Sequence, residues 1–201
     1  MILRAALAVA VAMIGAGAAS AAPAPPAAAG WPCETDPKPA LALGDYWPDA
    51  ARMKASANRV DPALDTLVAE VAPRRLDQAE AVDRLRAFVA RSGSVAERVQ
   101  LATALLDTID GERKVILDGI RRFNSRQDQL AKRIEQGYAA LDAPDAAQTG
   151  EARQALEDQA RWDQRIFEDR QRMLPIICRQ PAILEARVAA LIAAVRPGAS
   201  R

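Results

Sequence analysis

The chain has 201 residues, with 27 Lys and Arg against 26 Asp and Glu, two Cys and no His. Ala accounts for 46 residues and aromatic side chains for only 4%, so helix formers dominate and strand formers are scarce. The absence of His excludes His-based catalytic triads, His metal ligands and His-ligated haem. This composition predicts an all-α protein.

Residues 1–22 have the features of a secretory signal peptide. Arg4 precedes an uncharged Ala-rich run, and the small residues Ala19-Ser20-Ala21 fit a signal peptidase site. The run is shorter than the about 20 apolar residues of a spanning helix. We therefore expect cleavage and a periplasmic protein, the alternative being an uncleaved segment that tethers the chain to the membrane.

Cleavage would remove Arg4 and leave 26 basic and 26 acidic side chains. A neutral mature chain has no general electrostatic attraction for nucleic acid or anionic lipid. We expect no nucleic-acid partner, and contact with a membrane only if the signal is retained.

The two Cys predict a structural disulfide. The periplasm is oxidising, so an exported chain is expected to join Cys33 to Cys178. The loop between them is long, and its closure would stabilise the fold by at most about 5 kcal/mol. A redox-active pair would need a Cys-x-x-Cys spacing or a thioredoxin-like pattern, and neither is present. We expect no metal and no cofactor.

Residues 23–60 form a Pro- and Ala-rich leader. Seven Pro between Pro23 and Pro48 predict an extended segment, because Pro disrupts helix interiors. Trp31, Tyr46 and Trp47 are suited to anchor this leader against the helices, and a ligand site is the alternative role for these rings.

Two helices are predicted next. The first begins at the cap Asp61 with Pro62 in its first turn and ends before Pro73. The second begins at Asp77, three residues before Glu80, and ends at Gly93. Both carry apolar residues at helical spacing.

A long third helix is predicted from the capping box Ser94-Val95-Ala96-Glu97 to Pro144. An alternating spacing of four and three predicts a coiled-coil-like seam, reaching about 70 Å at 1.5 Å per residue. The positions of this seam are Val95, Val99, Ala102, Leu106, Ile109, Arg113, Ile116, Ile120, Phe123, Gln127, Leu130, Ile134, Gly137 and Leu141.

Residues 142–150 have the composition of a turn, and a fourth helix follows from about Glu151 to Arg179. Pro175 is expected to kink it, and Pro181 to begin a last helix that ends before Pro197. The apolar side of the fourth helix is predicted to comprise Leu156, Trp162, Ile166, Phe167, Met173, Leu174, Ile176 and Ile177.

The short turn makes the long helices antiparallel neighbours. Centring it near residue 146 sets Phe123 opposite Asp169 and Ile116 opposite Ile176. We expect residues 61–201 to form an all-α domain, in which a small helical bundle forms the base and residues 116–175 form a projecting two-helix hairpin. Buried polar residues on the seam, such as Arg113, Gln127 and Asp163, would fix the register of the helices.

The sequence contains none of the usual nucleophile, phosphate-binding or calcium-binding motifs. We expect no enzymatic activity. A peptidoglycan-active helical enzyme is the alternative, because glycoside cleavage needs only carboxylates. Glu70 and Glu112 are the acids considered for it, although nothing in the sequence distinguishes them.

Three stretches resemble uncharacterised exported proteins of α-proteobacteria. They are Trp162-Asp-Gln-Arg-Ile-Phe-Glu-Asp-Arg-Gln, then Ile176-Ile-Cys-Arg-Gln-Pro with the following Leu-Glu-Ala-Arg, and Trp31-Pro-Cys. The resemblance covers about a third of the chain. It supports export and the disulfide, and it implies no activity.

The predicted function is that of a periplasmic, non-enzymatic interaction, scaffold or accessory protein. Its partner would be another protein or a second copy of the chain, met through helix-in-groove or coiled-coil contact. The candidate partner-contact or seam residues are Trp31, Trp47, Arg113, Gln127 and Trp162.

Overall fold

The computed structural model describes residues 30–53, 62–91, 94–143 and 150–198. Within these ranges every regular element is an α-helix, which confirms the all-α prediction. The signal peptide, the caps at Asp61 and Gly93, and most of the turn at 142–150 lie outside the described residues. The helices are α1 (Leu43–Tyr46), α2 (Pro48–Arg52), α3 (Pro62–Val71), α4 (Gln78–Arg91), α5 (Val95–Asp142), α6 (Glu151–Cys178) and α7 (Gln180–Val195).

Two predicted helix starts have the expected caps. The Ser94 side chain accepts a hydrogen bond from the Glu97 amide at 3.2 Å at the start of α5. Asp77 accepts from the amides of Ala79 and Glu80 at 2.8 and 3.3 Å at the start of α4. These bonds satisfy amides that have no partner within the helix.

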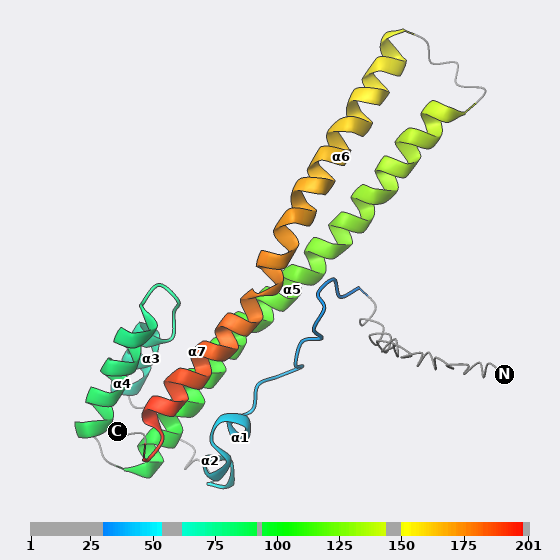
Figure 1. The fold of residues 1–201 in the computed structure, drawn as a ribbon. Helices are drawn as coiled ribbons and strands as arrows, with labels where there is room; N and C mark the ends of the chain where they lie inside the picture. The colour runs from blue at the N-terminus through cyan, green and yellow to red at the C-terminus, as the bar shows by residue number, and fades with distance from the viewer. Residues whose placement is uncertain (1–29, 54–61, 92–93, 144–149, 199–201) are drawn as a thin grey trace, which may run out of the picture.

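The main core lies at one end of the molecule, where α3 and α4 pack with the first part of α5 and with α7 (Figure 1). The apolar residues of this core recur at helical spacing, so each helix buries one apolar side. The most deeply buried are Val71, Leu85, Leu101, Leu105, Ile109, Leu184, Val188, Leu191, Ile192 and Val195. We call this assembly the base.

The leader is not extended throughout, which corrects the sequence prediction. Residues 43–52 form the two short helices α1 and α2. Pro48 is compatible with α2 because it occupies the first turn, where no backbone N–H is needed for the helix. Trp47, between the two helices, is only 3% exposed and belongs to the main core.

The apolar seam of α5 is covered along its length. α7 lies along the first part of α5, and α6 lies along the rest, extending away from the base (Figure 1). Of the fourteen predicted seam residues, Val95 alone is exposed. We call α6 and the part of α5 beside it, from about residue 116, the helical arm. Coiled-coil packing within the arm stays a prediction.

The pairing register is close to the predicted one. The Gln127 side chain bonds to the Phe167 carbonyl at 3.3 Å, whereas a turn centred at residue 146 would place residue 165 there. Ile116 and Ile177 pack against the same small apolar cluster, and Ile177 is one residue from the Ile176 predicted opposite Ile116. α6 continues through Pro175 to Cys178, and only Arg179 separates it from α7.

Arg187 of α7 joins two parts of the base. Its guanidinium is buried and donates to the carbonyls of Val71, Ala72 and Pro73 at 2.8, 2.9 and 3.0 Å. These carbonyls lie at the C-terminal end of α3, where no helical amide remains to pair with them. Burial lowers the pKa of Arg187, but an arginine remains charged in proteins.

We expect Arg187→Ala to lower the free energy of unfolding by about 3 kcal/mol, because it leaves buried carbonyls without donors and opens a void. Urea unfolding measures this change. Arg86→Ala is the matched control, since Arg86 is exposed and its one ion pair among the described residues is a 3.6 Å contact with Asp83. Equal losses in the two variants would contradict the structural role of Arg187.

Candidate interaction surface

The disulfide between Cys33 and Cys178 is present, with the two Cα atoms 5.7 Å apart. This confirms the predicted pairing. The bridge links the leader to the last residue of α6 and lies in a small apolar cluster where the base meets the helical arm. The cluster comprises Trp31, Cys33, Leu117 and Ile120, with Ile116, Ile177 and Cys178 packed against it.

Trp31 serves to pack the leader against α5. Its side chain is 7% exposed, and its indole N–H donates to the Thr35 carbonyl at 2.8 Å. The Arg121 guanidinium lies 5.8 Å from the ring centre, at a distance typical of a cation–π contact. Asn124 donates to the Gly30 carbonyl at 3.4 Å. Trp31 therefore anchors the leader against the helices, which is the role expected for an amphipathic aromatic ring in this segment.

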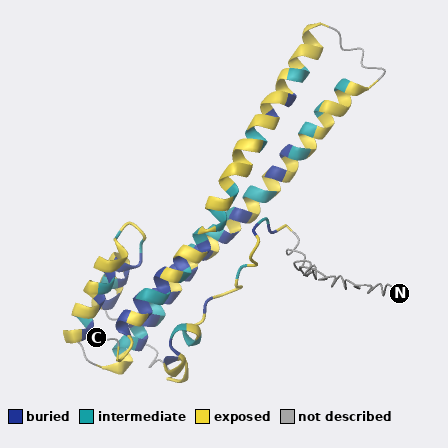
Figure 2. Cartoon of the chain, viewed as in Figure 1, coloured by how far each residue is buried: buried dark blue, intermediate teal, exposed yellow. Residues whose placement is uncertain are grey.

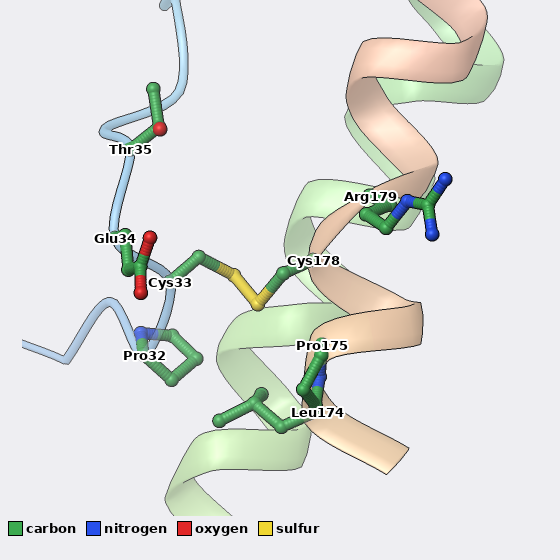
Figure 3. Close-up of a pocket in the computed structure, with 8 residues that line it drawn as sticks. All are labelled: Pro32, Cys33, Glu34, Thr35, Leu174, Pro175, Cys178 and Arg179. Atoms are coloured by element: carbon green, nitrogen blue, oxygen red, sulfur yellow. A yellow bond between two sulfur atoms is a disulfide. The ribbon is translucent and has the colours of Figure 1, made fainter.

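A cavity of about 390 Å³ lies beside the disulfide. Figure 3 shows Cys33 reaching from the leader across to Cys178, with Arg179 pointing away from the leader. The lining residues are Pro32, Cys33, Glu34, Thr35, Leu174, Pro175, Cys178 and Arg179. The lining is mixed, because the proline rings, Leu174 and the disulfide lie beside the polar side chains of Glu34, Thr35 and Arg179.

Arg113 lies in the base at the level of the leader, and its side chain is fully buried. It donates to Glu185 Oε1 at 2.8 Å, to Asp110 Oδ1 at 3.2 Å and to the Lys38 carbonyl at 2.5 Å. Lys114 adds an ion pair to Asp110 at 2.8 Å. The residue therefore joins α5, α7 and the leader, and it is inaccessible to a partner.

Two polar contacts lie within the helical arm. Gln127 is 3% exposed and donates to the Phe167 carbonyl, while its own side-chain oxygen has no hydrogen-bond partner among the described residues. Arg133 binds both carboxylate oxygens of Asp163 at 2.8 and 3.0 Å. The hydrogen bonds from Arg133, with a further one from Gln159, lower the pKa of Asp163. Bidentate geometry is directional, so the pair helps to hold α6 in register on α5.

Trp162 differs from the other candidate residues because it is 55% exposed. The Arg165 guanidinium, three residues further along α6, lies 5.3 Å from its ring centre. Trp31, Trp47, Arg113 and Gln127 are buried inside the chain, which leaves Trp162 as the candidate that faces solvent.

The predicted apolar side of α6 divides into two. Phe167, Leu174 and Ile177 are half-buried on the side toward α5. Met173 and Ile176 are 49% and 54% exposed, so together with Trp162 they contradict the single buried side expected from the sequence. The signal that distinguishes the two sides is spacing, because residues seven apart, such as Trp162, Asp169 and Ile176, recur on one side of a helix.

The acids considered for hydrolysis do not form a catalytic pair. Glu112 binds Arg74 at 2.8 Å, and Glu70 binds Arg84 at 3.3 Å, all with partly exposed side chains. In the described part of the chain, no three Cys, Asp or Glu side chains gather as a metal site would require.

No protein-family model matches the chain, and the comparisons with curated proteins and with solved structures also find no match. Across residues 30–53, 62–91, 94–143 and 150–198, no helix combines the length and apolar character that crossing a membrane requires. The disulfide is compatible with an oxidising compartment outside the cytosol.

Replacing Cys33 and Cys178 together by Ser should lower the free energy of unfolding by about 2–4 kcal/mol, because the unfolded chain gains the entropy that the closed loop denies it. Urea unfolding with and without reductant measures the effect. Reductant should destabilise the unaltered chain and leave the double variant unchanged. A double variant as stable as the oxidised chain would contradict this expectation.

Asp163→Asn should lower the free energy of unfolding by about 1 kcal/mol at pH 7, a modest loss because Arg133 is largely exposed and water screens the pair. The folded-state pKa of Asp163 is lowered, so its contribution is present above about pH 4 and is lost as the pH falls through that pKa. Unfolding at pH 7 and pH 3 should show the difference between the two chains shrinking in acid. A difference that stays constant would contradict the ion pair as its source.

Proposed function

We propose that this protein is an exported, non-enzymatic interaction protein, and that the helical arm carries its binding surface for a protein partner. One observation carries the proposal: the arm presents a large aromatic side chain, Trp162, to solvent at 55% exposure. Aromatic residues on stable surfaces dominate the energetics of protein–protein contacts.

The way the arm is built supports this role. The Arg133–Asp163 pair and the Gln127 contact hold α6 against α5. At the base, the disulfide and Arg113 connect the leader to the same helices. A surface that is already ordered before binding loses less conformational entropy when a partner arrives.

Export is the second part of the proposal. It is supported by the signal-like sequence of residues 1–22. A disulfide that joins both Cys of the chain also suits a periplasmic location.

Affinity capture of the tagged full-length chain after crosslinking in the periplasm tests the proposal. The chain should recover a protein partner reproducibly, and Trp162→Ala should reduce the recovery at least tenfold, because this side chain is exposed on the arm. Removing an aromatic anchor commonly costs 2 kcal/mol or more of binding free energy.

Met53→Ala is the matched control, since Met53 is an exposed apolar residue of the leader, at 44% exposure. It should leave the recovery unchanged. The proposal fails if no partner is recovered, or if Trp162→Ala binds as well as the unaltered chain.

A further inference from the structure

α6 carries a second apolar stripe that no part of the described chain covers. Its members are Trp162, Ile166, Met173 and Ile176, spaced by four, seven and three residues, with the exposed Asp169 in the gap. Ile166 is half-buried, while the other three are 49–55% exposed. We call these four residues the outer stripe. Ile183 of α7, at 45% exposure, continues the same spacing.

The outer stripe lies on the side of α6 away from the leader. Cys178, where the leader is attached, follows Ile176 by two residues, which is about 200° around a helix. Residues 162, 166, 173 and 176 span fourteen positions, or about 21 Å of helix. Figure 2 shows exposed residues along the outward sides of both long helices. The leader therefore leaves this side of the arm uncovered.

α5 contributes cations to the same side of the arm. Asn124 contacts the leader at Gly30, and Arg122 and Arg126 are each two residues away from it, about 200° around α5. Val115, at 66% exposure, is likewise two residues and about 200° around α5 from Leu117. Leu117 packs in the cluster with Trp31 of the leader. Helical geometry therefore places Val115, Arg122 and Arg126 beside the outer stripe.

None of these cations is the main partner of an acid within the described ranges, although the charge of Arg165 adds to the hydrogen bond from Arg161 in lowering the pKa of Asp158. Arg122, Arg126 and Arg165 form no ion pair there, and the side chain of Arg126 bonds instead to the Arg122 carbonyl at 3.3 Å. The acids on this side are Asp169, which Arg172 binds, and Asp158, four residues before Trp162, which Arg161 binds. The side of the arm that carries the outer stripe thus combines a narrow apolar surface with three cations that can form ion pairs with the acidic groups of a partner.

The spacing and the charge together indicate what fits this surface. Apolar residues repeated by four and three match the side chains of another helix. A helix with two apolar sides is typical of assemblies with three or more helices, and here one side already packs against α5. A second copy of the chain would bring the same unpaired arginines to the contact, and like charges there oppose association.

We propose that the outer stripe, with Val115, Arg122, Arg126 and Arg165, binds an amphipathic acidic helix of a partner protein. The partner helix lays its apolar side along the stripe and sets Glu or Asp side chains against the three arginines. This inference rests on the proposed function and adds the side of the arm and the chemistry of the partner.

Site-specific photocrosslinking in the periplasm tests the inference with the full-length chain. Benzoylphenylalanine is introduced at Met173, within the stripe, and in a separate chain at Gln171, which is exposed and two residues away on another side of α6. Crosslinking at Met173 should exceed that at Gln171 at least tenfold. Mass spectrometry of the crosslinked peptide should place it in a helical segment with net negative charge.

Charge reversal supplies the second measurement. The triple variant Arg122→Glu, Arg126→Glu and Arg165→Glu should lower the crosslinking at Met173 at least tenfold, because the cations become anions facing an acidic helix. The triple Lys variant should retain most of it. The three arginines form no ion pair with any described residue, so both variants should keep the circular dichroism and urea midpoint of the unaltered chain.

The outcomes separate this inference from the proposed function. Crosslinking at Gln171 but not at Met173 keeps a partner and overturns the assigned surface. Crosslinking at Met173 to a basic or non-helical segment, to lipid or to a second copy of the chain overturns the acidic helix. Full crosslinking by the Glu variant also overturns it. The absence of crosslinks at both positions, together with failed affinity capture, overturns both proposals.

Discussion

The structure depends on a single constraint, which is that the apolar seam of the 48-residue helix α5 has to be covered. A lone helix of this length would leave that seam in water, at a cost of roughly 25 cal/mol for each Å² of apolar surface. The chain covers it with two successive helices, α7 over the first part and α6 over the rest. Only Arg179 separates these two helices, so together they form an almost continuous partner for α5. The base and the helical arm are thus two stretches of one packing interface, and they differ in what else surrounds α5.

Polar residues divide this interface into sections. Arg113 lies where the leader, α5 and α7 meet, and its neighbours Asp110 and Glu185 balance its charge. Gln127 and Asp163 occur further out, where the arm has only two helices. A purely apolar two-helix interface would tolerate sliding by a heptad, because each turn resembles the next. Directional contacts at fixed positions oppose that sliding.

Much of the fold follows from local sequence features. Ser94 and Asp77 mark helix starts, and the spacing from Val99 to Leu141 identifies the covered side of α5. The Cys33–Cys178 pairing could be predicted because these are the two Cys of a chain whose sequence predicts export. The short helices at 43–52 escaped prediction because the abundance of Pro outweighed the favourable position of Pro48. Trp162 was identified as a candidate from the sequence. The split of α6 into two apolar sides was not predicted, because the sequence shows that a residue is apolar but does not show which neighbour it contacts.

The disulfide also determines how the molecule carries mechanical load. Tension applied through the leader reaches Cys33 and passes directly into the end of α6, because the S–S bond joins positions 145 residues apart in the sequence. The force then runs along the short remaining path through α7 to the C-terminal side of the base. The helices from α1 to α6 all lie within the bridged loop and are shielded from the pull. A chain held at its N-terminal end would therefore keep its arm in register under tension that could otherwise peel the leader from the helices.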